Sequence, residues 1–81
     1  MYEVIYSDLA LESLDKLSSK IRTRIVNKIS STKKNPFRYF LRLKKMKSYR
    51  LRVGDYRVIA DISYNQIYIH YVIHRRNAYK R

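Results

Sequence analysis

Three arginines around a short turn are the residues whose types and spacing most clearly indicate chemistry. Gly54-Asp55 is typical of a two-residue hairpin turn, because Gly supplies the positive φ that such a turn requires. Pairing the flanking residues outward from this turn places Arg52 opposite Arg57, with Arg50 on the same face of the hairpin. Like charges in directly opposite positions are destabilising, whereas guanidinium groups bind phosphate through two parallel hydrogen bonds. The spacing therefore predicts a binding site for phosphate or a similar anion.

A second predicted turn, at Asn65-Gln66, extends this pairing to the last strand. Continuing the register places His74 opposite Arg57, and His70 opposite Asp61. His74 thus joins the arginine cluster, while His70 and Asp61 are expected to form a cross-strand ion pair. The opposite face of the three strands is predicted to be the core face, with Tyr49, Leu51, Val53, Tyr56, Val58, Ala60, Ile62, Ile69, Tyr71 and Ile73.

Further basic residues lie in the sequence on both sides of these strands. Arg75 follows His74 directly and is therefore expected next to the Arg57 cluster. The remaining basic candidates for contact with an anionic partner precede or follow the strands, and they are Lys44, Lys45, Lys47 and Arg76. Tyr79, in the same tail as Arg75 and Arg76, is close enough in sequence to fold back over the cluster.

Other kinds of site find little support. The chain has no cysteine and a single glycine, so we expect neither a thiolate metal site nor a glycine-rich phosphate loop. His70 and His74 are four residues apart on a predicted strand, which is not a metal-ligand pattern. The six acidic residues are scattered, so two-metal hydrolysis is not expected either. We predict a site without metal or cofactor.

The elements that must position these residues follow from the hydrophobic pattern. Residues 2–6 alternate as in a strand, and Ser7-Asp8 is a helix start. Ser18-Ser19 caps a second helix that runs to about Thr32, and Asn35-Pro36 ends it. Residues 37–46 are expected to be an irregular basic connection, before the three strands. The order β-α-α-β-β-β predicts one α+β domain over residues 1–81, with two antiparallel helices packed on one face of an antiparallel sheet.

The charge is high and unevenly distributed along the chain. The formal net charge is +13 in 81 residues, and residues 33–81 hold fourteen of the nineteen Lys and Arg but only two of the six Asp and Glu. A one-signed field of this strength attracts polyanions, so nucleic acid or an acidic protein is the expected partner. No apolar run is long enough to span a membrane, and the first residues are acidic rather than basic. We therefore expect a cytoplasmic protein without a membrane partner.

Three segments of the chain resemble the RelE/ParE toxin superfamily. They are residues 43–47 (Leu-Lys-Lys-Met-Lys), residues 49–59 (Tyr-Arg-Leu-Arg-Val-Gly-Asp-Tyr-Arg-Val-Ile) and residues 74–79 (His-Arg-Arg-Asn-Ala-Tyr). The order of elements is similar as well, so the resemblance covers essentially the whole chain. One departure is Met46-Lys47-Ser48, in the loop where the family usually carries glycine.

The resemblance to RelE implies a toxin that enters the ribosomal A site and cuts messenger RNA. In that reaction the ribose 2′-OH attacks the adjacent phosphate and leaves a 2′,3′-cyclic phosphate and a free 5′-OH. It implies catalytic roles at five positions, with a phosphate-stabilising role for Arg57 and the family's terminal tyrosine at Tyr79; the others are Arg50, Arg52 and Arg75. Arginine stays protonated near neutral pH, which leaves Tyr79, His74 and Lys47 as candidates for proton transfer.

Two other functions fit the same sequence. A ParE-like toxin would share the fold and inhibit DNA gyrase without being an enzyme, and a nucleic-acid-binding module would bind RNA or DNA without cleaving it. In either toxin case the resemblance implies an acidic RelB-like antitoxin as partner. A heterotetramer of toxin and antitoxin is one assembly that the resemblance allows, and the sequence leaves the stoichiometry open. The RelE reading adds the ribosome and messenger RNA as partners. The full set of arginines with Tyr79 favours this reading.

Overall fold

The structure is a computed structural model that describes residues 1–78. Its helices are α1 (Asp8–Asp15), α2 (Ser19–Ser31), the short 3₁₀ helix η1 (Pro36–Arg38) and α3 (Arg75–Ala78). Its strands are β1 (Glu3–Tyr6), β2 (Leu41–Arg42), β3 (Tyr49–Val53), β4 (Tyr56–Ser63) and β5 (Gln66–His74). The predicted order of elements is confirmed, with β2, η1 and α3 as additions. Among these residues, no helix combines the length and the apolar character that a membrane span needs.

Serine residues begin both long helices, as the sequence predicts. The Ser7 side chain accepts a hydrogen bond from the Ala10 N–H at 3.0 Å, and the Ser18 side chain accepts one from Ile21 at 3.3 Å. These bonds satisfy backbone donors that have no partner inside a helix. The two caps thus mark where each helix starts.

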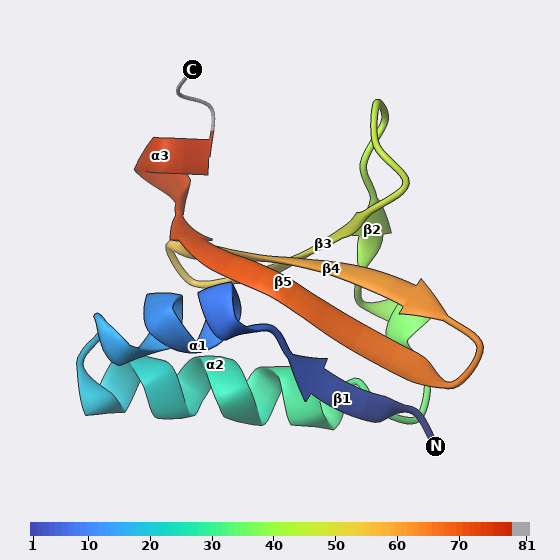
Figure 1. The fold of residues 1–81 in the computed structure, drawn as a ribbon, viewed down its shortest axis with the longest axis horizontal. Helices are drawn as coiled ribbons and strands as arrows, with labels where there is room; N and C mark the ends of the chain where they lie inside the picture. The colour runs from blue at the N-terminus through green and yellow to red at the C-terminus, as the bar shows by residue number, and fades with distance from the viewer. Residues whose placement is uncertain (79–81) are drawn as a thin grey trace.

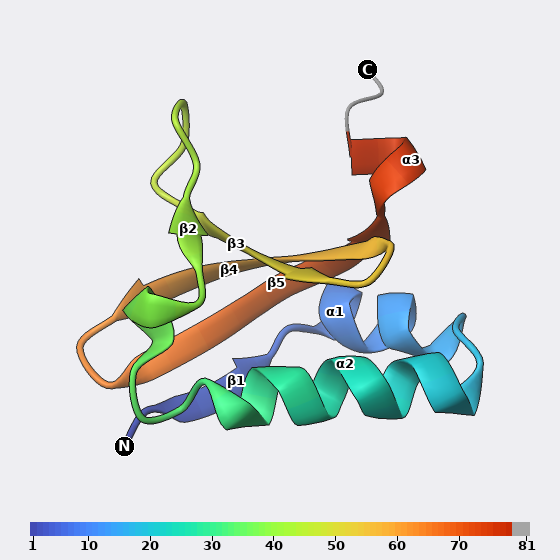
Figure 2. The ribbon, with the colours of Figure 1, turned by 180° about the vertical axis from the view of Figure 1, so that it is seen from behind.

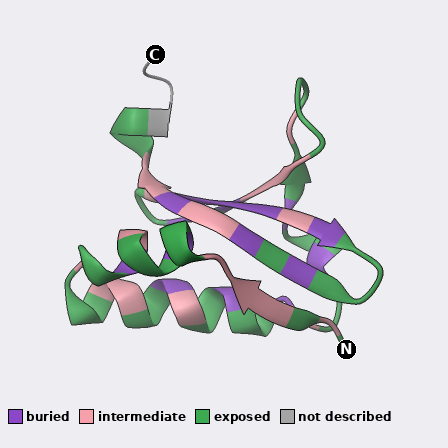
Figure 3. Ribbon diagram, viewed as in Figure 1, coloured by how far each residue is buried: buried purple, intermediate pink, exposed green. Residues whose placement is uncertain are grey.

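The helices α1 and α2 lie together on one face of a five-stranded sheet, whereas α3 and the loop after β2 project from the opposite face (Figures 1 and 2). Buried residues occur on both the sheet and the helix pair (Figure 3), and they form one hydrophobic core cluster. The helices contribute Ala10, Leu14, Ile25 and Ile29, and the sheet contributes Leu51, Val53, Val58, Ala60, Ile62, Ile67, Ile69 and Val72. The face away from the helices is therefore open to a ligand.

The sheet has the order β1-β5-β4-β3-β2 and is mixed rather than wholly antiparallel. β1 runs parallel to β5, with Glu3 beside Gln66 and Tyr6 beside Ile69, and all other pairs are antiparallel. The α+β class is thus confirmed, but the expected antiparallel sheet is wrong at this edge. After β1, the helix pair carries the chain back to the end of the sheet at which β1 starts. β5 starts at that end as well, so β1 and β5 run in the same direction.

The β3–β4 hairpin has the predicted register. Val53 pairs with Tyr56, Arg52 with Arg57, and Arg50 with Ile59. Gly54 adopts φ 58°, the left-handed conformation that the two-residue turn requires. Arg50, Arg52 and Arg57 therefore start from the same face of the sheet, away from the helices.

The register predicted for β5 is wrong. The turn is Tyr64-Asn65, since Ser63 pairs with Gln66, and a bulge then interrupts the pairing. Ile59 pairs with Tyr71 but Ala60 pairs with Ile69, which leaves His70 as the extra residue. Ser7, which follows β1 and caps α1, holds this bulge with two hydrogen bonds. It donates its N–H to the Ile69 carbonyl and its hydroxyl to the His70 carbonyl.

The bulge reverses the faces of the end of β5. Ile69 and Val72 are both buried against the helices although they are three residues apart. Tyr71 and Ile73, predicted in the core, instead lie on the open face, and His74 pairs with Tyr56 rather than with Arg57. The predicted meeting of His74 and Arg57 is therefore incorrect.

Candidate anion-binding site

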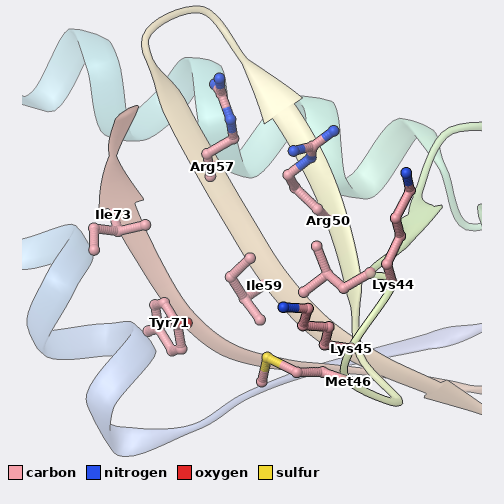
Figure 4. Close-up of a pocket in the computed structure, with 9 residues that line it drawn as sticks. Lys44, Lys45, Met46, Arg50, Arg57, Ile59, Tyr71 and Ile73 are labelled. Carbon is pink, nitrogen blue, oxygen red and sulfur yellow. The ribbon is translucent and has the colours of Figure 1, made fainter. Parts of the chain in front are cut away.

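A hollow of about 360 Å³ lies on the open face of the sheet and combines cations with an apolar surface. We call it the basic hollow. Its lining comprises Leu43, Lys44, Lys45, Met46, Arg50, Arg57, Ile59, Tyr71 and Ile73 (Figure 4). Four of these residues are basic and none is acidic. A ligand that carries both a negative group and a flat apolar group matches this lining.

Arg57 is the central residue of the basic hollow because its charge is buried before any ligand arrives. Its side chain stands on β4, in the middle of the sheet, and the residue is only 6% exposed. Among the described residues, nothing accepts a hydrogen bond from its Nε or Nη1. A buried charge without a partner costs several kcal/mol in order-of-magnitude terms, so the fold keeps this guanidinium at a cost that a bound anion would offset.

Three further cations surround the same space. Arg50 stands on β3 beside Arg57, and Lys44 and Lys45 reach the hollow from the loop between β2 and β3 (Figure 4). The Leu43 N–H donates to the Ser48 carbonyl at 3.0 Å and closes the base of this loop. The strands thus fix the two guanidinium groups, and the loop brings the two ammonium groups over the open face.

Two predicted site residues have other surroundings. Arg52 pairs with Arg57 in register, but its side chain lines a different hollow on the side of α2, so the facing arginines do not share one space. Lys47 is exposed and does not line the basic hollow. β2 pairs only with Tyr49 and Arg50, so the rest of β3 forms an edge of the sheet. Arg52 lies on this unpaired part, which leaves room for its side chain to turn away from Arg57.

The residues that follow β5 lie at the other end of the sheet. The Arg75 N–H donates to the Asp55 carbonyl at 2.7 Å, and its Nε lies 3.7 Å from the Asp55 carboxylate. The Arg76 N–H donates to Nδ1 of His74 at 3.1 Å, and the His74 ring lies edge-on against Tyr56. These contacts fix the start of α3 beside the β3–β4 turn. Arg75, Arg76 and His74 do not line the basic hollow, and Tyr79 lies outside the described residues.

The arrangement matches a family of known proteins. The family model described as the ParE toxin of type II toxin–antitoxin systems, parDE, matches residues 4–79. The chain belongs to this family, within the RelE/ParE superfamily. It is a toxin of a type II toxin–antitoxin system. Among curated proteins, no sequence matches the toxin.

Solved structures of RelE toxins have the same fold. The RelBE2 toxin–antitoxin complex of Mycobacterium tuberculosis matches with 26% identity and a TM-score of 0.80, over 91% of this chain and 98% of that one. The archaeal RelE–RelB complex of Pyrococcus horikoshii matches with 23% identity and a TM-score of 0.77, over 95% and 98%. The E. coli RelBE complex matches with 22% identity and a TM-score of 0.74, over 89% and 94%.

The apolar part of the basic hollow in this toxin was not predicted from the sequence. Ile59, Tyr71 and Ile73 form it together with Leu43 and Met46 of the loop. Ile59 pairs with Arg50 in the hairpin, so the two-residue turn is the one local signal that places an apolar residue on the open face. Tyr71 and Ile73 carry no such signal, because the bulge at His70 reverses the faces that strand alternation predicts for them.

Two titratable features of the toxin lie outside the basic hollow. The predicted contact between His70 and Asp61 is confirmed, with 2.9 Å between Nε2 and Oδ2, although the bulge makes it a diagonal contact. Burial raises the pKa of Tyr6 on β1, which packs against the core on the helix side. Within residues 1–78, no group of three His, Cys, Asp or Glu side chains is placed to hold a metal ion.

Proposed function

We propose that this toxin is a ribosome-dependent endoribonuclease that cuts messenger RNA in the ribosomal A site. The observation that carries the proposal is Arg57, a buried guanidinium without a described partner in the lining of an open, basic hollow. Such a group is desolvated and held in place in advance, which is what stabilisation of a transition state requires. An mRNA phosphate is the anion that the RelE resemblance implies.

The proposed reaction is an attack of the ribose 2′-OH on the adjacent phosphate. A bond forms between the 2′ oxygen and phosphorus, and the bond from phosphorus to the 5′ oxygen breaks. The 2′-OH proton passes to a base, and a proton reaches the departing 5′ oxygen. Negative charge grows on the phosphorane oxygens, where Arg57 and Arg50 stabilise it through paired N–H donors. Lys44 and Lys45 add positive charge from the loop.

We assign the proton transfer to Tyr79 on the basis of the resemblance. The two other candidates have surroundings that fit the role less well. The His74 ring lies edge-on against Tyr56 and its Nδ1 accepts a hydrogen bond from the Arg76 N–H, and Lys47 lies outside the lining of the basic hollow. We propose that Arg75, Arg76 and Arg52 contact the RNA backbone beside the cleaved phosphate.

The apolar part of the hollow supports RNA over a simple anion. Ile59 and Ile73 offer apolar surface in the same hollow as the cations, and Tyr71 adds an aromatic ring. A nucleotide carries a base and a phosphate at a short fixed separation, so both parts of the lining have a use. Single-stranded RNA is recognised in this way, through stacked bases and neutralised phosphates.

The partner that restrains the toxin is proposed to be an acidic, RelB-like antitoxin in the cytoplasm. The similar structures of M. tuberculosis, P. horikoshii and E. coli are complexes of RelE with RelB by their descriptions. A net charge of +13 favours a partner of opposite charge. A heterotetramer of two toxins and two antitoxins is the assembly that we expect.

The direct experiment is primer extension on messenger RNA in a purified translation reaction. Parent protein and Arg57→Ala are compared, with and without ribosomes. We expect cuts that need ribosomes and that disappear in the variant. Intact message in this reaction, from a toxin that still blocks the growth of cells that express it, would overturn the proposal.

A ParE-like gyrase inhibitor is the second candidate function. The match of the ParE toxin family model to residues 4–79 favours it, although the basic hollow has no evident use in it. A supercoiling assay with purified gyrase separates the two candidates. Inhibition of supercoiling without any RNA cleavage would establish the gyrase reading, and absence of both activities would favour a binding module.

A further inference from the structure

A second basic hollow lies between α2 and the β3–β4 hairpin, and Arg52 is the one residue of its lining that the proposed function uses. We call it the α2 groove. It has a volume of about 480 Å³ and is lined by Arg24, Asn27, Lys28 and Ser31 of α2 and by Arg52 and Gly54 of the hairpin. No acidic residue lines it. The groove thus brings three cations of two distant segments into one space.

The cations of the α2 groove have no carboxylate partners among the described residues. Within residues 1–78, carboxylates contact basic side chains in two pairs, His70 with Asp61 and Arg75 with Asp55, and neither pair lies in the α2 groove. The Arg24 guanidinium instead lies directly against the turn, where a Cβ built on Gly54 would be 3.0 Å from Nη1. A guanidinium held beside two further cations is destabilised by repulsion unless an anion is shared between them.

An exposed aromatic ring lies beside these cations. The Lys28 Nζ lies over the Tyr39 ring, 5.3 Å from its centroid, and Tyr39 is 41% exposed. A basic groove bordered by an exposed aromatic ring is the arrangement by which proteins bind single-stranded nucleic acid, with phosphates in the groove and a base on the ring. An acidic peptide would use the cations but not the ring.

Strand β3 connects the two hollows. Arg50 lines the basic hollow and Arg52 lines the α2 groove, and two residues along a strand are separated by about 6.8 Å. A strand of RNA with one phosphate at Arg50 and Arg57 can therefore cross β3 and place following phosphates at Arg52, Arg24 and Lys28. Asn27 and Ser31 supply neutral polar groups along the same path.

We propose that the α2 groove, with Tyr39, binds the continuation of the RNA strand whose phosphate lies in the basic hollow. The ligand is thus single-stranded RNA that extends several nucleotides beyond the reacting phosphate. This inference rests on the proposed function for the identity of the strand. It assigns a binding role to Arg24, Lys28 and Tyr39, which the sequence did not single out.

The test compares RNA binding by the parent protein with that of two charge-matched double variants. Arg24→Gln/Lys28→Gln removes two cations of the groove, and Lys16→Gln/Lys34→Gln removes two exposed cations elsewhere. The probes are uncleavable 2′-O-methyl RNA oligonucleotides, one of about twelve nucleotides and one of three. Dissociation constants are measured over a range of salt concentrations, and circular dichroism checks the fold of each variant.

We expect the groove variant to bind the long oligonucleotide about tenfold more weakly, with a salt slope smaller by about 1.4. The control variant should lose no more than about threefold, since it changes only the long-range field. The three-nucleotide probe should bind the groove variant and the control variant equally, because it occupies the basic hollow alone. Tyr39→Leu should also weaken binding of the long probe.

Three outcomes overturn the inference. They are equal losses in the two double variants, an equal loss for the short and long probes, and no binding of the long probe by the parent protein. A poly-glutamate peptide that loses affinity for the groove variant, while RNA does not, would assign the groove to an acidic peptide and also contradict it. If one of these results is found and ribosome-dependent cleavage is still observed, only the inference about the α2 groove fails. If RNA binding depends on the groove but no cleavage is observed, only the proposed function fails.

Discussion

At the scale of single residues, Arg57 and Gly54 have opposite effects on stability: the first lowers it and the second is required for it. Arg57 is buried, charged and without a described acceptor for its Nε and Nη1. Gly54 adopts φ 58° and leaves space that the Arg24 side chain uses. The first fits the proposed binding of an anion, and the second the tight turn that sets the register of the hairpin.

Replacing the buried charge of Arg57 should stabilise the free toxin. Arg57→Met keeps most of the aliphatic stem but removes the desolvated guanidinium, so the free energy of unfolding should rise by about 1–2 kcal/mol. Urea denaturation of parent and variant measures the difference. Added phosphate should stabilise the parent more than the variant, because a ligand that binds only the folded state raises stability. A variant that unfolds at a lower urea concentration than the parent would contradict this account.

The turn residue can be tested with a pair of substitutions. Gly54→Ala should lower the free energy of unfolding by about 1 kcal/mol, because alanine is strained at positive φ. Gly54→Asn should lose less, since asparagine tolerates this conformation, although both substitutions add a Cβ near Arg24. Thermal unfolding distinguishes them. Equal losses would show that contact with Arg24, and not backbone strain, limits this position.

At the scale of elements, the β3–β4 hairpin was predicted correctly and β5 was not. A two-residue turn with glycine fixes its register locally, so the positions of Arg50, Arg52 and Arg57 followed from the sequence. The bulge in β5 depends on hydrogen bonds from Ser7, which is 63 residues away from His70. The turn before it places Tyr64 at φ 52°, which is uncommon for tyrosine. Local patterns do not carry either feature.

The edge strand β1 gives a prediction on pH. Burial raises the pKa of Tyr6 above its ordinary value, so the neutral phenol is favoured in the folded state. The stability that the neutral Tyr6 side chain contributes is fully present below the pKa of tyrosine in the unfolded state, and it is lost as the pH rises through the pKa of Tyr6 in the folded state. Tyr6→Phe should therefore lose less stability than the parent between about pH 8 and about pH 11. Parallel pH profiles for the two proteins would show that Tyr6 makes no such contribution.

At the scale of the whole molecule, the fold class and the basic character of one region followed from the sequence, but the site did so only in part. The register predicted which arginines start from the open face, and the structure places Arg50, Arg57, Lys44 and Lys45 around one hollow. Which way Arg52 turns, and how deeply Arg57 is buried, depend on neighbours from separate elements. Sequence spacing along a strand does not contain this information.

The overall charge predicts how the toxin meets its antitoxin. Because most of the net charge of +13 lies in residues 33–81, association with an acidic antitoxin should be steered electrostatically. The association rate constant should fall by about tenfold or more between low and high salt, while the dissociation rate constant changes less. Stopped-flow measurements with the purified pair test this expectation. An association rate indifferent to salt would refute electrostatic steering.

The central claim is that Arg57 stabilises the transition state of RNA cleavage. The most direct test measures how fast the parent and Arg57→Met cut messenger RNA on programmed ribosomes under single-turnover conditions. If Arg57 stabilises the charge on the phosphorane, the variant should cut about 10²- to 10³-fold more slowly while remaining folded and bound to ribosomes. The products of the parent should end in a 2′,3′-cyclic phosphate. A folded variant that cuts at the parent rate would contradict the assignment of the basic hollow as the catalytic site.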